Sequence, residues 1–230
     1  MRALINQEIA EKFTAATGIA TIPLKPYNLL DSPVACHADM LFCIIDNKLF
    51  CYEDYVKENG YTEALIDSGY DIIFVSHKCE KNYPYDIGLN VLVMGNHLFC
   101  NAKYTAKEII DYANQNNYTV VSVKQGYSAC STLVINNNLA VTTDASIAKA
   151  IEKSGKRALL ISAEGIILNG YNCGFIGGAS CFFQDKVFVF GDISALKCGE
   201  VLLDLFDQNN LSVFPILTGG VYDFGGIKLI

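Results

Sequence analysis

The sequence predicts an α/β fold with five-fold pseudosymmetry, a propeller of ββαβ units closed by the N- and C-terminal strands. Three observations predict it. A strand–helix–strand pattern recurs about five times, and an apolar hairpin with a polar tip accompanies each copy. The first and last apolar segments of the chain could also pair as neighbouring strands. A repeat of about 46 residues is close to the size of a propeller blade. We therefore expect one domain of five repeats over residues 1–230.

The strand that follows each helix begins in the same way in all five units. Each starts with Gly or Asn, which readily adopt the left-handed conformation found at the C-terminus of many helices. We therefore expect a helix to end just before each of these residues. The five strands are Gly18–Leu24, Gly69–Val75, Asn117–Val123, Gly155–Ile161 and Asn210–Ile216.

Two helices also carry signals at their N-termini. Thr105 and Glu108 have the spacing of a capping box ahead of Ile109, and Asp144 is a typical N-cap ahead of Ile147. In both segments the apolar residues recur at the helical period. Each helix is therefore expected to bury one face.

Hairpins complete the units. A strand with a polar tip and a returning apolar strand predict each turn. The fifth hairpin strand, Gly226–Ile230, has Ala3–Ile5 as its natural partner, and this pairing would close a ring that leaves no sheet edge. An open solenoid is the alternative. The other four hairpins are Met40–Ile45 with Leu49–Cys51, Leu89–Met94 with Leu98–Cys100, Thr132–Ile135 with Leu139–Val141, and Ser180–Phe183 with Val187–Val189.

Composition excludes several classes of protein. With 51% hydrophobic and 18% charged residues, the chain can bury a large core. Its apolar runs are far shorter than the roughly 20 residues that span a bilayer, so no membrane association is expected. Polar residues follow the initiating Met too soon for a signal peptide, which indicates the cytoplasm. The net charge of −7 opposes a phosphate backbone, so nucleic acid is not an expected partner.

The nine cysteines are an odd number and include no C-x-x-C pair. Most are therefore expected to be reduced core residues, and without close pairs no structural zinc site is expected. They are Cys36, Cys43, Cys51, Cys79, Cys100, Cys130, Cys173, Cys181 and Cys198.

The loops carry distinctive strings of residues. They are His37–Met40, Tyr83–Asp86, Lys124–Ser131, Gly174–Ser180, Gly191–Asp192 and Asp223–Gly225. With the five-unit pattern, the chain resembles the penteins, the guanidino-group-modifying enzyme fold of arginine deiminases, dimethylarginine hydrolases, amidinotransferases and translation initiation factor 6. The strings resemble those of an uncharacterised bacterial family with that fold.

The resemblance implies a nucleophilic cysteine near the C-terminus, a histidine one or two units earlier, and acidic residues that hold a guanidinium group. This sequence departs from that order. Its last cysteine is Cys198, at the fourth unit's helix, and its C-terminal loop carries Asp223 instead. The resemblance therefore leaves the nucleophile unassigned.

Loops at one end of the ring are expected to form a shared mouth. His37 and Asp39 stand two residues apart at the predicted start of a strand, so both side chains would point to one face. They suit a general base with its orienting carboxylate, or part of a metal site, although a strand-start histidine with a capping aspartate is as good an interpretation.

Cys130 is the candidate nucleophile. It stands at a loop-to-strand junction, where Lys124 could lower the pKa of an exposed thiol. A buried thiol at the start of a core strand is the alternative, and Cys181 is the second candidate.

Acidic and glycine residues complete the inventory. Asp86 and Asp223 suit the planar donors of a guanidinium group, whereas Asp192 is better explained as a turn residue. A strand follows Gly177 and Gly178 where a phosphate-binding helix would have to begin, so nucleotide binding is not expected there. The two glycines would instead let the backbone approach the axis of the ring or a ligand closely.

Two functions follow from this inventory. The first is a hydrolase or amidinotransferase-like enzyme without a cofactor that acts on a small guanidino or amidine compound. In this enzyme Cys130 attacks the compound, His37 moves protons, and Asp39 orients the imidazole of His37. The second is a non-catalytic pentein that binds a small molecule or a protein.

Overall fold

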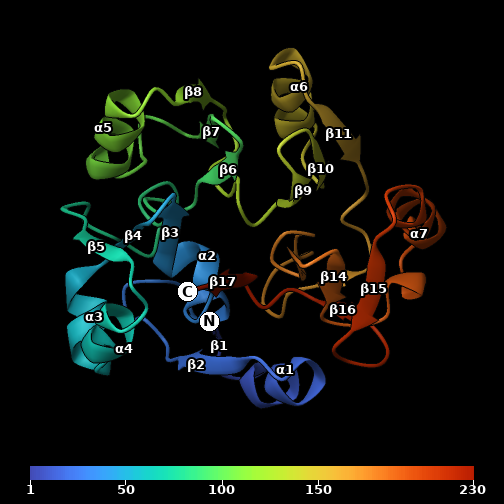
Figure 1. The fold of residues 1–230 in the computed structure, drawn as a ribbon, viewed down its shortest axis with the longest axis horizontal. Coiled ribbons are helices and arrows are strands. Elements are labelled where there is room, and N and C mark those ends of the chain that lie inside the picture. The colour runs from blue at the N-terminus through green and yellow to red at the C-terminus, as the bar shows by residue number, and fades with distance from the viewer.

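Five three-stranded sheets share one construction in the computed structural model, which describes residues 1–230. In each sheet the middle strand pairs antiparallel with one neighbour and parallel with the other. Figure 1 shows the long helices on the outside of this arrangement. The sheets are separate from one another, in the orders β17-β1-β2, β3-β4-β5, β6-β7-β8, β9-β10-β11 and β13-β14-β15.

The strands are short and follow the predicted segments closely. They are β1 (Arg2–Asn6), β2 (Ala20–Leu24), β3 (Phe42–Ile45), β4 (Lys48–Cys51), β5 (Asp71–Phe74), β6 (Leu92–Met94), β7 (His97–Cys100), β8 (Thr119–Ser122), β9 (Thr132–Asn136), β10 (Leu139–Thr142), β11 (Arg157–Leu160), β12 (Ile166–Ile167), β13 (Ser180–Phe183), β14 (Lys186–Val189), β15 (Ser212–Pro215), β16 (Val221–Tyr222) and β17 (Ile227–Leu229).

A helical segment precedes the parallel strand of every three-stranded sheet. The helices are α1 (Ala10–Thr17), α2 (Ala38–Leu41), α3 (Glu53–Asn59), α4 (Thr62–Ile66), α5 (Lys107–Gln115), α6 (Ala145–Lys153) and α7 (Gly199–Gln208), with short 3₁₀ turns at Ser32–Val34 and Ile193–Ala195.

The residues predicted to end the helices do adopt the left-handed conformation. Their φ angles are 72° at Gly18, 79° at Gly69, 60° at Asn117, 75° at Gly155 and 56° at Asn210. Only residues that tolerate positive φ are stable at such positions, which explains why Gly and Asn recur there. This prediction is confirmed in all five units.

The terminal strands pair as predicted. β1 and β17 are antiparallel, with Ala3 opposite Leu229 and Ile5 opposite Ile227. The two ends of the chain lie close together near the centre of Figure 1. The first sheet is therefore built from both ends of the sequence.

Three local predictions are wrong. The segment that begins at Met40 starts as helix α2 rather than as a strand, and the strand predicted from Leu89 begins only at Leu92. The capping box is absent, because the Thr105 hydroxyl donates to the Asn101 carbonyl and the Glu108 carboxylate accepts from the Ser76 amide. By contrast, Asp144 caps α6 by accepting from the amides of Ser146 and Ile147.

A two-stranded sheet was not foreseen. β12 and β16 are parallel and only two residues long, below the length at which alternation can be recognised in a sequence. Immediately after β16, the Asp223 amide donates to the Ile167 carbonyl at 2.8 Å. This small sheet therefore fixes the backbone that carries Asp223.

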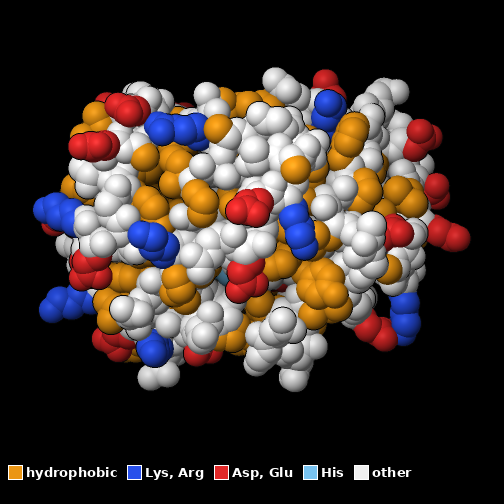
Figure 2. Space-filling view, turned by 90° about the horizontal axis from the view of Figure 1, so that it is seen from below, with side chains coloured by type: hydrophobic (Ala, Val, Ile, Leu, Met, Phe, Trp, Pro, Cys, Tyr) orange, Lys and Arg blue, Asp and Glu red, His pale blue; other side chains and the backbone are white.

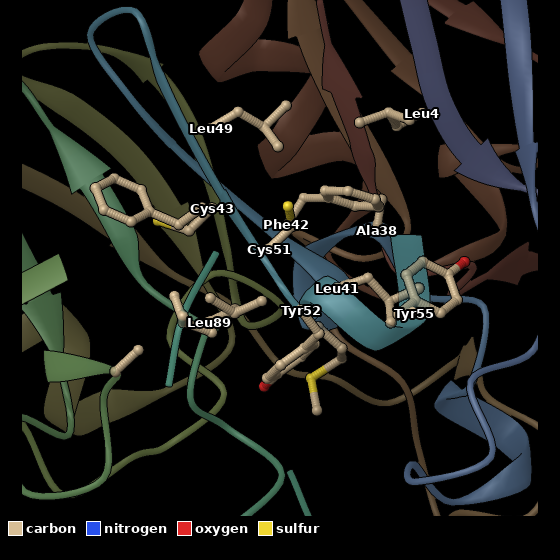
Figure 3. Packing of buried hydrophobic residues seen from close by; sticks show 14 of the residues in the cluster. Leu4, Ala38, Leu41, Phe42, Cys43, Leu49, Cys51, Tyr52, Tyr55 and Leu89 are labelled. Atoms are coloured by element: carbon tan, nitrogen blue, oxygen red, sulfur yellow. The ribbon is translucent and has the colours of Figure 1, made fainter. Parts of the chain in front are cut away.

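The largest hydrophobic cluster surrounds α2. Figure 3 shows Leu41 and Phe42 among the side chains of Tyr52, Tyr55 and Leu89. All nine cysteines are free thiols and six of them are buried, as predicted for reduced core residues. Because Ala38, Met40 and Leu41 are fully buried, α2 is anchored in the core despite its four residues.

The surface carries both signs of charge. Figure 2 shows acidic and basic side chains interspersed with apolar ones on one face of the molecule. None of the helices has the length and apolar character needed to cross a bilayer.

Candidate functional site

A cavity of about 230 Å³ brings together side chains from distant parts of the sequence. We call it the His37 cavity. Its lining includes His37 from the N-terminus of α2, Tyr127 and Cys130 from the loop before β9, Cys173 and Phe175 from the loop between β12 and β13, and Asp223 from the turn after β16.

Asp223 occupies a carboxylate site built by backbone amides. One oxygen, Oδ2, accepts from the Phe175 amide at 2.8 Å, and Oδ1 accepts from the Gly225 amide at 2.9 Å. Burial raises its pKa to about 7, and the negative charge of Asp39 adds to the rise, although the two amides oppose it. At neutral pH this carboxylate therefore exists in both protonation states.

His37 faces Asp223. Its Nδ1 lies 3.9 Å from Asp223 Oδ1, and its Nε2 has no hydrogen-bond partner. The side chain is buried, which lowers its pKa to about 3. The imidazole is therefore neutral at physiological pH.

Cys130 is buried in the wall of the same cavity. Its Sγ accepts a hydrogen bond from Asn90 Nδ2 at 2.9 Å. Burial raises the pKa of the thiol well above its usual value, and the charges of Asp39 and Asp223 raise it further. The prediction that Lys124 lowers this pKa is wrong, because Lys124 is exposed and does not line the cavity.

Asp39 does not lie beside His37 in the cavity. The two residues belong to the start of a helix, where positions two apart point in different directions, and not to a strand, where they would share a face. Asp39 lines a separate cavity, and burial raises its pKa to about 6. The carboxylate nearest to the His37 ring is that of Asp223.

Asp86 supports the wall of the His37 cavity from behind. Its Oδ2 accepts a hydrogen bond from the Tyr127 hydroxyl at 2.6 Å, whereas Oδ1 has no partner. Burial raises the pKa of this carboxyl group. Asp86 thus holds the aromatic ring of Tyr127, which lines the cavity.

Removing the Tyr127 hydroxyl tests this support. We expect Tyr127→Phe to lower the free energy of unfolding by about 1–3 kcal/mol, because it leaves the buried Asp86 carboxyl without its donor. Urea unfolding would measure the change. Tyr83→Phe is a matched control, because the exposed Tyr83 hydroxyl donates only to the Lys124 carbonyl, and an equal loss in both variants would contradict the role given to Asp86.

Gly177 and Gly178 approach other parts of the protein closely. A Cβ on Gly177 would lie 2.3 Å from the Ala129 carbonyl oxygen, and one on Gly178 would lie 1.9 Å from Asp223 Oδ1. The Gly178 amide also donates to the Cys130 carbonyl at 2.9 Å. The two glycines therefore let this loop pack directly against the backbone around Cys130 and the carboxylate of Asp223.

Two neighbours of the site were missed. Asn90 donates to Cys130 Sγ and accepts from the Ala129 amide at 2.8 Å, and its position as a lone amide in an apolar run was the available signal. Cys173 is a partly exposed thiol that lines the His37 cavity, and no local pattern marks it.

Other sequence candidates lie elsewhere. Cys181 lines the cavity of Asp39, and burial raises its pKa to about 12. Asp192 accepts from the Ser194 amide and caps a 3₁₀ turn, as expected for a turn residue. The structure contains no group of three or more His, Cys, Asp or Glu side chains that could hold a metal ion.

Solved structures with the pentein fold, the fold of the guanidino-group-modifying enzymes, are similar to this chain. Dimethylarginine dimethylaminohydrolase from Pseudomonas aeruginosa, complexed with citrulline, has 9% sequence identity and a TM-score of 0.60, with 98% of this chain and 95% of that chain covered. An amidinotransferase of the saxitoxin pathway from Microseira wollei has 10% identity and a TM-score of 0.57, with 90% of this chain and 74% of that chain covered.

Agmatine deiminase from C. jejuni is similar as well, at 11% identity and a TM-score of 0.53, with 94% of this chain and 74% of that chain covered. The chain itself belongs to a family described as a family of unknown function, DUF6873, whose model matches residues 2–228. None of the curated proteins matches the sequence. The family resemblance expected from the sequence is confirmed at the level of the fold.

Proposed function

We propose that the chain is a single-domain pentein, with its five units closed into a ring by the terminal strands, that acts as a cysteine-dependent hydrolase or amidinotransferase-like enzyme on a small guanidino or amidine compound. The observation that carries this proposal is Asp223, a buried carboxylate with no cationic partner in the wall of a cavity that also holds a thiol and a neutral imidazole.

The charge of the cavity favours a cationic ligand. No Lys or Arg lines the His37 cavity, and an ionised Asp223 is costly to bury without an opposite charge. The rings of Tyr127 and Phe175 lie 6.3 Å apart between centroids and offer faces on which a planar cation can rest. A guanidinium group supplies both the charge and the flat donor edge that a carboxylate accepts.

The same charge would activate the nucleophile. A cation bound beside Cys130 stabilises the thiolate and lowers the raised pKa of the thiol. The thiol proton would pass to the imidazole of His37, which lines the same cavity, and the sulfur would attack the central carbon of the guanidinium group. His37 would then give this proton to the departing amine, which leaves the carbon bound to the Cys130 sulfur. Water or an acceptor amine would next attack that carbon and break its bond to sulfur.

The remaining residues would act through these groups. The charge of Asp39 raises the pKa of Asp223 and so helps to keep a proton on it until the cation arrives. Asp86 holds Tyr127, while Gly177 and Gly178 keep the loop against Asp223 and Cys130.

A binding protein without catalysis is the second candidate. The specific observation in its favour is the environment of Cys130, which is buried, hydrogen-bonded by Asn90 and of raised pKa in the absence of a ligand. Such a thiol is inert in most proteins. In this case the cavity would bind the same class of cation and leave it unchanged.

Turnover of small guanidines separates the two candidates. We expect wild-type protein to convert at least one of arginine, agmatine, guanidinoacetate and acetamidine to its ureido or amide product, with release of ammonia or amine. Cys130→Ser should lower the rate by at least about 100-fold, since a serine hydroxyl is a far weaker nucleophile. Cys181→Ser, outside the cavity, is the matched control.

Mass spectrometry of the products would measure this conversion. Full activity in Cys130→Ser would refute the assigned nucleophile. Binding of a guanidine without any conversion by the wild type would favour the second candidate.

A further inference from the structure

A second cavity lies on the other side of the wall that contains Cys130. We call it the Asp39 cavity, and its volume is about 210 Å³. Neighbouring residues of the same segments divide between the two cavities: Asp39 and Ala129 line this one, whereas Met40 and Cys130 line the His37 cavity. The two cavities are therefore separate sites that share a wall.

The walls of the Asp39 cavity come from every three-stranded sheet. Each sheet contributes one edge strand, and the five are β3, β6, β9, β13 and β17. Most of the side chains that these strands supply are apolar, such as Ile44, Val93 and Phe182. The cavity has room for roughly seven water molecules at about 30 Å³ each, which is enough for a small organic molecule.

Two opposite charges line this cavity without forming an ion pair. Asp39 is 3% exposed, and neither of its carboxylate oxygens accepts a hydrogen bond. Lys228 from β17 is partly exposed, and it forms an ion pair neither with Asp39 nor with any other acid. The Cys130 thiol is close enough to Asp39 for a contact with the carboxylate to lower the pKa of Asp39 and raise that of Cys130, but no cation contacts the carboxylate.

We propose that the Asp39 cavity binds a small aliphatic α-amino acid, with its ammonium group on the Asp39 carboxylate, its carboxylate toward Lys228 and its side chain among the apolar strand residues. A zwitterion satisfies both charges at once, whereas an amine or a carboxylic acid satisfies only one. The ammonium group supplies three donors to a carboxylate that has no cationic partner. This binding does not require the proposed reaction in the His37 cavity, although the charge of Asp39 also raises the pKa values of Cys130 and Asp223 there.

The burial of Asp39 supports the assignment. A buried carboxylate without a cationic partner is unfavourable, and burial raises its pKa to about 6 although the contact with the Cys130 thiol and the charge of Lys228 oppose the rise. A charged donor that binds there recovers the lost hydration and makes charge-assisted hydrogen bonds. The cavity should therefore bind most tightly a ligand that places its positive charge on the Asp39 carboxylate.

Isothermal titration calorimetry of the full chain with L-alanine, L-valine and L-leucine tests the proposal. Isobutylamine and isobutyrate serve as analogues of valine that lack one of the two charges. We expect at least one amino acid to bind, and both analogues to bind at least about tenfold more weakly than valine, because each loses a charge-assisted contact.

Variants then locate the ligand. We expect Lys228→Gln and Asp39→Asn each to weaken amino-acid binding by about tenfold or more, whereas Lys12→Gln on the exposed face of α1 leaves it unchanged. Phe175→Leu changes a side chain that lines the His37 cavity but not the Asp39 cavity, and it should also leave amino-acid binding unchanged. If Asp39→Asn does not fold, Lys228→Gln still tests whether the amino acid binds in the Asp39 cavity. The Lys228 side chain is partly exposed and forms no ion pair, so its loss should not disturb folding.

Three results would overturn the proposal. They are an absence of binding by all three amino acids, binding of isobutylamine as tight as that of valine, and binding that Phe175→Leu abolishes while Lys228→Gln does not affect it. The last result would place the amino acid in the His37 cavity.

Discussion

Asp223→Asn is expected to weaken the binding of a guanidino cation by about 10- to 100-fold, because a neutral amide replaces a charged hydrogen-bond acceptor. The structure gives this carboxylate no cation of its own, so the ligand's charge is the interaction that is lost. Calorimetry with agmatine would measure the change. Asp192→Asn, in an exposed turn, is the matched control.

The same substitution should change how stability depends on pH. Burial raises the pKa of Asp223 in the folded protein to about 7, above the value of a free carboxyl group. The folded state therefore holds a proton that the unfolded state loses, and the resulting stability is present below about pH 4 and lost as the pH rises to about 7. Asparagine does not titrate and shows no such loss.

Urea unfolding of both proteins between pH 4 and pH 8 would test this sign. We expect the stability of Asp223→Asn relative to wild type to increase across that range by up to about 1.4 kcal/mol per pH unit. At pH 4 the variant should be the less stable of the two. The backbone amides of Phe175 and Gly225 each donate to one oxygen of Asp223, and in Asp223→Asn one of these amides would face the side-chain NH₂ group, which cannot accept a hydrogen bond. A difference that is constant with pH would contradict the raised pKa.

Gly178→Ala is expected to cost about 2–3 kcal/mol of folding free energy and to abolish ligand binding. The new Cβ would lie 1.9 Å from Asp223 Oδ1, so one of the two must move. The backbone cannot move freely, because the Gly178 amide donates to Cys130 and its carbonyl accepts from the amides of Phe224 and Gly226. Overpacking at such fixed contacts typically costs this much.

Thermal and urea unfolding would measure the effect of Gly178→Ala, and calorimetry its binding. Gly220→Ala is a suitable control in the neighbouring turn, since its Cβ would meet only the ends of the Ile167 and Tyr222 side chains, the nearest at 3.0 Å. If both variants bind ligand as the wild type does, Asp223 is not held by this loop in the manner described.

Features that depend on a few adjacent residues could be predicted from the sequence. The left-handed residues at the ends of the helices are one example, because only Gly and Asn tolerate positive φ at little cost. The hairpins are another, because alternating apolar residues and a polar tip specify them locally. The pairing of Ala3–Ile5 with the C-terminal strand followed from the count of units and needed no local signal.

The errors share one physical cause, which is that tertiary contacts override a local pattern. Thr105 and Glu108 have the spacing of a capping box, but Glu108 accepts instead from Ser76, 32 residues away. Met40 is drawn into a buried helical turn, so His37 and Asp39 face different cavities. Cys173 reaches the site only because its loop packs on Asp223 through Gly174 and Phe175.

The central claim is that a buried carboxylate of raised pKa in the His37 cavity receives a cationic ligand. Calorimetric titration with arginine, agmatine, guanidinoacetate or acetamidine, repeated in buffers of different ionisation enthalpy, counts the protons exchanged on binding. A bound cation stabilises the ionised form of Asp223, so the protein must release protons. We expect release at pH 6.5 that is greatly reduced in Asp223→Asn, whereas binding with no proton release, or with proton uptake, would contradict the account.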